Sequence, residues 1–219
     1  DEDILLIAGD NYVSFNMQDL IDNYTDGTPL LAAYDVKEKD LAKQFGTVIL
    51  DADSKSVKHF EEKPSQPKSS IVSTGCSILP CKVFPILKEF ARNHPDDIGG
   101  LFEEFIRRGQ SVGCYVSENL WFDIGSFQSY MKATKTLLGN RVLKEGASID
   151  PETQCEGSVV LGSESIVRRC KLKNVVLFER CILKDCVLED CIIDRDCTFN
   201  NVELHEKMIM AKTRIYGRE

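Results

Sequence analysis

The 219-residue sequence has one tryptophan, three histidines and no C-x-x-C pair among its nine cysteines. The odd cysteine count and the missing spacing favour neither a disulfide framework nor a common zinc motif. No apolar run approaches the roughly 18 residues needed to cross a bilayer, and no signal peptide is recognisable. We therefore expect a cytoplasmic protein with no membrane partner, whose cysteines act as small buried hydrophobes.

Basic residues are also scarce. Lys and Arg number 27 against 35 Asp and Glu, which gives a formal net charge of −8. A nucleic-acid surface would need clustered Lys and Arg, so we expect no nucleic-acid partner. Small anionic substrates remain compatible with this composition if positive charge is local. The length suits one ordinary domain and a smaller one.

Residues 1–140 alternate strand and helix patterns. Apolar runs of strand type occur at 29–36, 71–79 and 111–116, and 46–60 is patterned as a hairpin. Helical spacing occurs at 16–24, 82–94, 101–109 and 126–138, with Ser126 as a predicted N-cap and Gly109 as a predicted stop. This alternation predicts an α/β layered domain, a mixed sheet flanked by helices.

From about Gly146 the pattern changes to short cycles without helix. An aliphatic residue is followed four positions later by a small one, as at Ile166 and Cys170 or Leu177 and Cys181. The period is five or six residues, too short for an independent unit, so successive turns must stack and share a core. We predict that residues 141–219 form a parallel β-helix.

The cysteines fit this repeat. With three short strands per coil, Cys170 and Cys186 lie about one coil apart, as do Cys181 and Cys197. Each pair should then stack at roughly the ~4.8 Å strand spacing, at inward corners that admit only small side chains. We expect these thiols to serve packing rather than metal binding or redox chemistry.

Three stretches of the first region combine polar residues with backbone features that packing does not require. Asp10 follows Gly9 at the end of a strand that we take to be parallel, the edge at which open α/β sheets bind ligands. The segment HFEEKP, residues 59–64, offers an ammonium for a phosphate and a carboxylate for hydroxyls. WFDIG, residues 121–125, places Asp123 between bulky apolar residues. Asp10 could instead be a turn residue, HFEEKP a solvated turn, and Asp123 a helix cap.

Magnesium would give the two aspartates one purpose. Mg²⁺ prefers oxygen ligands and is commonly held by one or two carboxylates together with substrate phosphates. Asp10 and Asp123 are the predicted pair of metal ligands.

In order along the chain, LLIAGDN, FGTVILDADSKSVKHFEEKP, STGCSIL and WFDIGSFQSYMKA, followed by hexapeptide-like repeats, resemble the sugar-phosphate nucleotidyltransferases. The resemblance implies a partial Rossmann-like nucleotidyltransferase domain and a left-handed β-helix. It also implies an enzyme that joins a nucleoside triphosphate to a sugar 1-phosphate, with glucose 1-phosphate as the prior, and that forms a homo-oligomer through the β-helix.

The resemblance also assigns roles to individual residues. Asp10 and Asp123 match the family's Mg²⁺-binding, catalytic aspartates. Gly46 matches a glycine whose backbone approaches the sugar, and Glu62 and Lys63 match a pair that binds sugar hydroxyls and the sugar phosphate. Gly75 matches a glycine that lines the sugar pocket. Thr74 stands where the family usually has Asn, which puts one sugar contact in doubt.

One family feature is missing from the sequence. The family carries a glycine-rich loop with Arg and Lys ahead of the first metal aspartate, and no such loop precedes Asp10 here. This departure predicts that the sequence begins partway through the catalytic domain and that the chain as given is catalytically incompetent or nearly so.

Two other functions stay open. A noncatalytic regulatory or scaffolding relative would share the architecture, although a scaffold has no need of two convergent acids. A hexapeptide acyltransferase would need a histidine base. The three histidines are His59, His94 and His205. The first two lie outside the repeats, and His205 lies at their far end with no evident partner.

Overall fold

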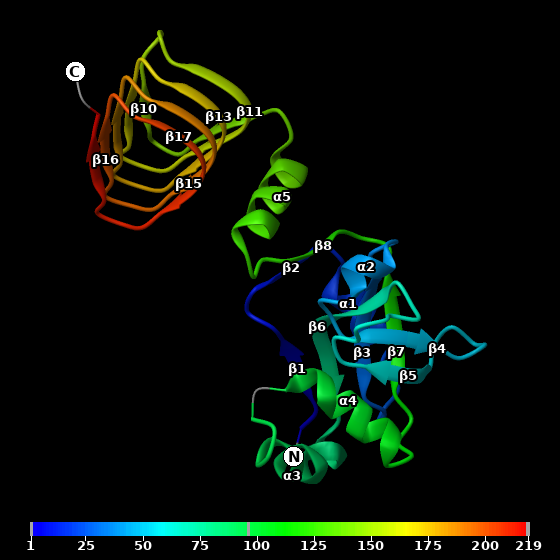
Figure 1. The fold of residues 1–219 in the computed structure, drawn as a ribbon. Coiled ribbons are helices and arrows are strands. Elements are labelled where there is room, and N and C mark those ends of the chain that lie inside the picture. The colour runs from blue at the N-terminus through cyan, green and yellow to red at the C-terminus, as the bar shows by residue number, and fades with distance from the viewer. Residues whose placement is uncertain (1, 96, 218–219) are drawn as a thin grey trace. The chain divides into compact units, whose positions relative to one another are not determined.

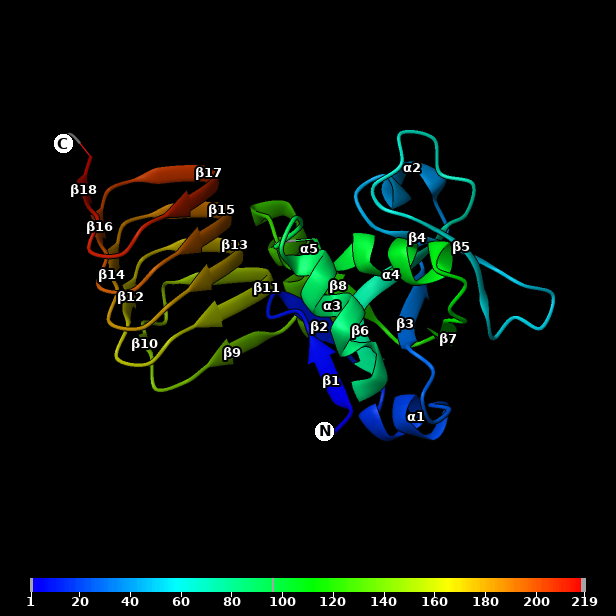
Figure 2. The same cartoon turned by 90° about the horizontal axis from the view of Figure 1, so that it is seen from below.

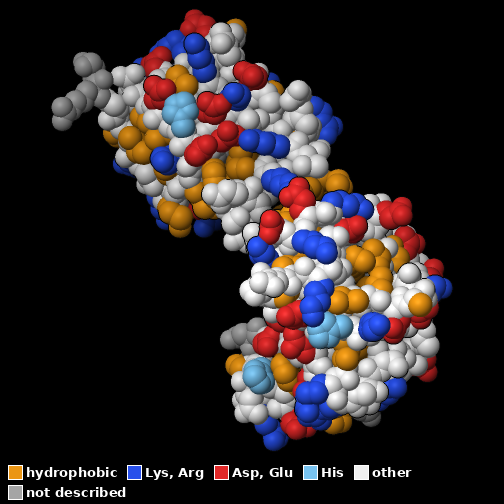
Figure 3. Space-filling model, turned by 45° about the vertical axis from the view of Figure 1, so that its right-hand side comes forward, with side chains coloured by type: hydrophobic (Ala, Val, Ile, Leu, Met, Phe, Trp, Pro, Cys, Tyr) orange, Lys and Arg blue, Asp and Glu red, His pale blue; other side chains and the backbone are white. Residues whose placement is uncertain are grey.

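The computed structural model describes residues 2–95 and 97–217. They form two compact units, one ending at Asp123 and the other beginning at Ile124 (Figure 1). Figure 3 shows acidic and basic side chains mixed on the visible face of each unit. Within the described ranges, no helix has the length and apolarity that crossing a membrane would require.

The first unit is built on a mixed six-stranded sheet. The strand order is β5-β4-β6-β3-β7, and β1 also pairs with β6. β3 and β7 are parallel, whereas the other pairings of this sheet are antiparallel, including the predicted hairpin of β4 and β5. The strands are β1 (Ile4–Ile7), β3 (Leu30–Asp35), β4 (Thr47–Leu50), β5 (Val57–Glu61), β6 (Ile71–Leu79) and β7 (Gly113–Ser117).

The prediction that Asp10 follows a parallel strand is wrong. β1 runs antiparallel to β6, with Ile7 opposite Cys76 and Ile4 opposite Leu79. The apolar run before Asp10 is compatible with either direction, because strand direction is set by the path of the chain and not by the residues of the strand. The position of Asp10 must therefore be explained by its neighbours in this sheet.

Helices cover both faces of the sheet, as Figure 2 shows for α1 and α4. In β3, Leu31 and Ala33 pack with the α4 cluster, whereas Leu30 and Ala32 pack with the α1 cluster. A strand buried on both faces accounts for the continuous apolar run of 29–36. The helical elements of this unit are α1 (Met17–Asp22), α2 (Lys39–Ala42), the 3₁₀ helix η1 (Cys81–Val83), α3 (Phe84–Ala91) and α4 (Ile98–Arg107).

Helix α4 begins three residues before its predicted start. The carboxylate of Asp97 accepts a hydrogen bond from the Gly100 N–H (2.7 Å) and so caps the first turn. The helix ends as predicted before Gly109, which adopts φ +73°. Its buried face places Leu101, Phe102 and Phe105 against the sheet.

A short two-stranded ribbon completes the first unit. β2 (Asn11–Val13) pairs antiparallel with β8 (Trp121–Asp123), with Asn11 opposite Asp123 and Val13 opposite Trp121. This ribbon joins the turn after β1 to the last strand of the unit, so it closes the unit by pairing its beginning with its end.

The second unit contains α5 (Phe127–Leu138) and a parallel β-helix. Ser126 caps α5 as predicted, within a capping box formed with Ser129. Met131 of α5 packs against Val176 and Ile192 of the β-helix. The solenoid strands form two parallel sheets, β10-β12-β14-β16-β18 and β9-β11-β13-β15-β17 (Figures 1 and 2). Their bounds are β9 (Val142–Lys144), β10 (Ser148–Ile149), β11 (Gln154–Leu161), β12 (Ile166–Arg168), β13 (Lys171–Leu177), β14 (Ile182–Lys184), β15 (Val187–Ile193), β16 (Thr198–Asn200), β17 (Glu203–Ile209) and β18 (Arg214–Tyr216).

The predicted period of five or six residues is present at the corners of the coils. Residues with positive φ recur at Glu164, Arg169, Asn174 and Arg180, with spacings of five, five and six. Together these three spacings equal one full coil, the offset at which Ile166 pairs with Ile182 and Ile182 pairs with Thr198. The long strands β13 and β15 each contain one of these corners, at Asn174 and Asp190, so each coil has three short sides.

The solenoid cysteines are packing residues, as predicted. Cys170, Cys181, Cys186, Cys191 and Cys197 are all buried in the solenoid core and are free thiols. The Cys197 N–H donates to Sγ of Cys181 (3.4 Å), and the Cys181 thiol donates to a backbone carbonyl of the next coil. A small side chain with some hydrogen-bonding capacity therefore suits this corner.

Candidate active site

The candidate site lies on the edge of β6 that pairs with both β4 and β1, at the gap between these two strands. β3 pairs along the other edge of β6, from Ile71 to Ile78. On the shared edge, β4 pairs at Val72 and β1 pairs from Cys76 onward, so residues 73–75 lie between the two strands. Within this interval Ser73 donates to the carbonyl of Gly46, and Gly75 accepts from the N–H of Ala8. The segments that carry Gly46 and Asp10 therefore leave the sheet side by side.

The ribbon places the backbones of the two predicted metal ligands close together. Asp10 directly precedes Asn11, and Asn11 is the pairing partner of Asp123. Opposed residues of an antiparallel pair have Cα atoms about 4.5–5.5 Å apart, so Asp10 and Asp123 occupy the same small region. Asp10 is exposed and Asp123 is half-buried.

This donor set fits magnesium. Two carboxylates supply the hard oxygen ligands that Mg²⁺ prefers, and substrate phosphates and water would complete its coordination. Within the described ranges, no group of three or more His, Cys, Asp or Glu side chains could hold a metal ion by itself.

Asn11 and Trp121 connect the ribbon to the Gly46 segment. Asn11 donates from Nδ2 to Oδ1 of Asp10 (2.8 Å) and accepts at Oδ1 from the indole N–H of Trp121 (2.6 Å). The Trp121 ring packs edge-on against Phe45, with ring centroids 5.0 Å apart. Asn11 was not singled out from the sequence. The available signal was the only tryptophan of the chain, Trp121, which lies two residues before the predicted ligand Asp123.

Glu62 and Lys63 form a tight turn beside Gly46. The Lys63 N–H donates to the carbonyl of Phe45 (3.2 Å), and Lys63 has φ +44°. The Glu62 N–H donates to Oε1 of Glu103 on α4 (2.7 Å). The side chains form a long ion pair of 3.8 Å, in which Glu62 is half-buried and Lys63 is exposed. The ammonium is thus free to move toward an anion.

Two glycines make room for the Glu62 carboxylate. A Cβ on Gly46 would come within 2.7 Å of Oε2 of Glu62 and would overlap the ring of Phe60. A Cβ on Gly99, in the first turn of α4, would overlap the same carboxylate. Sequence reasoning identified Gly46 and missed Gly99 and Glu103, which lie far beyond Glu62 in the sequence. The Gly99–Gly100 pair at the start of a helix was the available signal.

Burial raises the pKa of Glu62. Lys63 opposes this rise, whereas the negative charges of Asp97 and Glu103 add to it. The carboxylate is therefore partly desolvated before any ligand arrives, which strengthens the hydrogen bonds it can accept.

Gly75 lies beside the ribbon. It adopts φ +70°, and a Cβ there would come within 2.9 Å of Cβ of Ala8 and 3.4 Å of Nδ2 of Asn11. The preceding Thr74 is buried and donates its hydroxyl to the carbonyl of Ala32 (2.9 Å). The hydroxyl of Thr74 is therefore used within the sheet, by β3.

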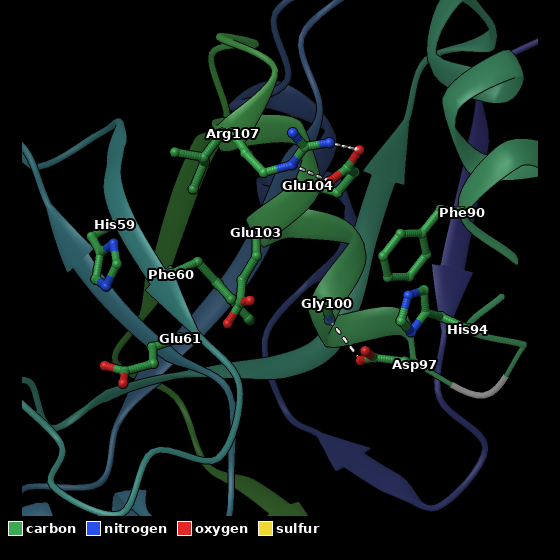
Figure 4. Close-up of a pocket in the computed structure, with 11 residues that line it drawn as sticks. His59, Phe60, Glu61, Phe90, His94, Asp97, Gly100, Glu103, Glu104 and Arg107 are labelled. Carbon is green, nitrogen blue, oxygen red and sulfur yellow. Dashed lines mark hydrogen bonds and ion pairs between the residues drawn. The ribbon is translucent and has the colours of Figure 1, made fainter.

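A separate cavity of about 560 Å³ lies between β5 and α4 (Figure 4). Asp97 there caps α4, and Glu104 binds Arg107 and Arg108. None of the six predicted site residues is among those that line it. These are His59, Phe60, Glu61, Phe90, His94, Asp97, Gly100, Glu103, Glu104, Ile106 and Arg107. Glu103 is the link between this cavity and the site, since its carboxylate holds the backbone of Glu62.

The chain is similar to known nucleotidyltransferases. The chain is 32% identical over 145 residues to a glucose-1-phosphate adenylyltransferase of Thermomicrobium roseum, covering 62% of this chain and 32% of that protein. It is 22% identical over 167 residues to the low-salt glycan biosynthesis nucleotidyltransferase Agl11 of Haloferax volcanii, covering 75% and 46%. The chain thus spans less than half the length of either relative.

A solved structure shows the same fold. It is that of a Bacillus anthracis protein assigned as a glucose-1-phosphate thymidylyltransferase, in complex with a sucrose. The TM-score is 0.52 at 23% identity, covering 60% of this chain and 53% of that one.

Residues 1–140 match the nucleotidyl transferase family. The boundary that we predict between residues 140 and 141 stays a prediction, and α5 packs with the second unit. With the matched segment covering more than half of the sequence, and with a β-helix following it, the chain belongs to the nucleotidyl transferase family.

Proposed function

We propose that this chain carries the sugar-phosphate and metal-binding part of a sugar-1-phosphate nucleotidyltransferase. The observation that carries the proposal is the meeting of β1 and β4 at residues 73–75 of β6. There Gly46 and the Glu62–Lys63 turn lie on one side, and Asp10 lies on the other. The names of the relatives support a sugar 1-phosphate as substrate, with glucose 1-phosphate as the first candidate.

Each residue then has a role that its surroundings suit. The exposed ammonium of Lys63 binds the sugar phosphate, and the desolvated carboxylate of Glu62 accepts hydrogen bonds from sugar hydroxyls. Gly46 and Gly75 let the backbone approach the sugar, since neither position has room for a side chain. Asp10 and Asp123 would hold Mg²⁺, which supplies charge neutralisation for the phosphates.

The proposed reaction joins two anions. An oxygen of the sugar phosphate attacks the α-phosphorus of the nucleoside triphosphate. The bond between the α-phosphorus and the oxygen that bridges it to the β-phosphate breaks, and pyrophosphate leaves. In such chemistry the protein mainly positions the reactants and stabilises charge. Lys63 fixes the nucleophile, while Glu62 and the glycines fix the sugar that carries it.

Titration calorimetry with UDP-, dTDP-, ADP- and GDP-sugars, with and without Mg²⁺, tests the proposal. We expect one of these ligands to bind in a Mg²⁺-dependent manner and an Asp10→Ala/Asp123→Ala double variant to lose that binding. An Asp26→Ala/Asp40→Ala variant removes two exposed carboxylates of the same unit and should bind as the parent does. Metal-independent binding would favour a noncatalytic scaffold, whereas absent binding would fit either a scaffold or a site that needs the missing glycine-rich loop.

The remaining expectations are also part of the proposal. The 219 residues hold no glycine-rich loop with Arg and Lys before Asp10, so we expect little pyrophosphate release from this chain in a coupled assay. A rate like that of a full-length relative would contradict this expectation. A homo-oligomer formed through the β-helix is tested by sedimentation. The absence of a nucleic-acid partner and the cytoplasmic location stay predictions.

The structure gives His205 two carboxylate neighbours, which the sequence did not reveal. His205 lies on β17, with Nε2 2.9 Å from Glu203 and Nδ1 3.4 Å from Glu189. The hydrogen bond to Glu203 raises the pKa of His205, and the ring is exposed on the surface of β17. Exposed pairs of this kind are common outside active sites, so this pair alone carries no acyltransferase proposal.

A further inference from the structure

Asn11 occupies a fixed position between an exposed carboxylate and a buried indole. Its Nδ2 donates to Oδ1 of Asp10 at 2.8 Å, and its Oδ1 accepts from Nε1 of Trp121 at 2.6 Å. An indole N–H can only donate and a carboxylate can only accept, so the two bonds together allow one orientation of the amide. Rotating the amide by half a turn would break both bonds.

Trp121 is itself held firmly. It is only 7% exposed, and its ring contacts Phe45 (centroids 5.0 Å apart) and Tyr34 (5.9 Å apart). Trp121, Asn11 and Asp10 thus form a hydrogen-bonded relay, in which the buried Trp121 ring fixes the orientation of the Asn11 amide. The Asp10 side chain, which is otherwise on the surface, is restrained through Asn11 by the packing of an aromatic cluster.

The same ring reaches the sugar side of the site. Phe45, which Trp121 contacts edge-on, directly precedes Gly46, and the Phe45 carbonyl accepts the N–H of Lys63. Trp121 is thus in contact with the segment that carries the proposed sugar-phosphate residues, and it is joined through Asn11 to the proposed metal ligand.

From this arrangement we infer that Asn11 and Trp121 are positioning residues. Their relay holds one oxygen of Asp10 and directs the other toward the metal, in register with the Gly46 and Lys63 segment. The inference rests on the proposed function, because it assigns a role to residues around the same site. Outer-shell partners of this kind change metal affinity by roughly 10–100-fold when they are removed.

Mn²⁺ affinity, measured by electron paramagnetic resonance, tests the relay without requiring turnover. Asn11→Leu preserves the approximate shape and removes both bonds, and Trp121→Phe keeps an aromatic ring and removes the indole donor. We expect each to weaken Mn²⁺ binding by roughly 10–100-fold. We expect the double variant to be no weaker than Asn11→Leu alone, because the two residues act in one chain.

Matched controls separate positioning from damage to the fold. Tyr12→Phe changes an exposed aromatic residue on the same strand, and Asn93→Leu changes an exposed asparagine elsewhere in the unit. Both should bind Mn²⁺ as the parent does. A general structural role for Trp121 would lower the melting temperature and leave the Mn²⁺ affinity of the folded protein unchanged, and that result would overturn the inference.

Trp121 also provides an optical signal, since it is the only tryptophan in the chain. We expect Mg²⁺ to shift the emission of the parent protein and to leave that of Asn11→Leu unshifted at concentrations that saturate both. Mn²⁺ should still quench both proteins, because the cation binds nearby in each. An equal Mg²⁺ shift in Asn11→Leu would count against the relay.

The outcomes distinguish the two proposals. If sugar nucleotides fail to bind but Mn²⁺ affinity depends on Asn11 and Trp121, the relay stands and the proposed function fails. If sugar nucleotides bind with Mg²⁺ and both variants match the parent in Mn²⁺ affinity, the relay fails and the function stands. If the parent does not bind Mn²⁺, both fail.

Discussion

The backbone of Gly46 lies against the carboxylate of Glu62, and a Cβ on the glycine would come within 2.7 Å of Oε2. Gly46 ends the loop before β4, whereas Glu62 directly follows β5. The hairpin therefore brings its two outer ends together at the candidate site, and Gly99 approaches the same carboxylate from α4. The Glu62 side chain can occupy this position only because residues 46 and 99 are glycines without side chains.

Gly46→Ala should displace Glu62. The added methyl would also overlap the ring of Phe60, which is buried, so both that ring and the Glu62 carboxylate must shift. We expect sugar-nucleotide binding to weaken by at least about tenfold, as loss of one hydrogen bond to a charged group would cause. Gly9→Ala is the matched control, since nothing lies within 4 Å of its Cβ. Equal binding by both variants in calorimetry would contradict the role of Gly46.

Glu62→Gln should raise stability at neutral pH. Burial raises the folded-state pKa of Glu62, with Lys63 opposing the rise and Asp97 and Glu103 adding to it. The folded-state pKa of Glu62 therefore lies above its unfolded-state pKa. The stability contributed by neutral Glu62 is fully present below the unfolded-state pKa and is lost as pH rises through the folded-state pKa. Ionised Glu62 therefore costs stability at about pH 7, and the neutral amide removes that cost.

Melting temperatures measured at about pH 7 and about pH 3 test the sign. We expect Glu62→Gln to melt higher than the parent at neutral pH and to show no such gain in acid, with weaker sugar-nucleotide binding. Glu118→Gln changes an exposed carboxylate of the same unit and serves as the control. A gain that is the same at both pH values would exclude the ionisation of Glu62 as its cause.

The sequence predicted those features that repeat or act locally. The β-helix was predictable because every coil restates its period, with corners such as Arg169 and Asn174 spaced five or six residues apart. The N-cap at Ser126 and the stop at Gly109 depend on neighbouring residues only. Asp10, Glu62 and Lys63 stood out because charged residues follow strand patterns closely at these positions.

Features that depend on distant contacts were missed. The direction of β1 is set by its pairing with β6, a strand much later in the chain, and an apolar run does not encode it. Glu103 lies 41 residues after the N–H that it accepts, so no local motif could join it to Glu62.

Cys181→Ser should be tolerated. Cys181 stands in a corner column with Ser165, Cys197 and Thr213, each 16 residues from the next, and it accepts the Cys197 N–H while its own N–H donates to Ser165 Oγ. A hydroxyl can make the same bonds, so we expect the free energy of unfolding to fall by less than about 1 kcal/mol. Cys181→Leu overfills the corner and should lower the free energy of unfolding by about 1–3 kcal/mol.

Far-UV circular dichroism during thermal unfolding compares the two cysteine variants. The fluorescence of Trp121 follows the first unit separately and should melt as in the parent protein. If serine cost as much as leucine, the thiol would be doing more than filling the corner.

Lys63→Met should separate the recognition of phosphate from the recognition of sugar. The Lys63 ammonium is exposed and only 3.8 Å from Glu62, so it is available to an anion. Removing it should weaken the binding of glucose 1-phosphate by about tenfold, because a hydrogen bond to a charged group is lost, and should hardly change the binding of glucose. The difference in glucose 1-phosphate affinity between the parent and Lys63→Met should shrink as the salt concentration rises, since an exposed charge is screened.

Lys68→Met is the control, since it leaves the turn intact and should bind both ligands as the parent does. If Lys63→Met weakened glucose and glucose 1-phosphate equally, the turn would have lost its shape, and Lys63 would not be the phosphate ligand.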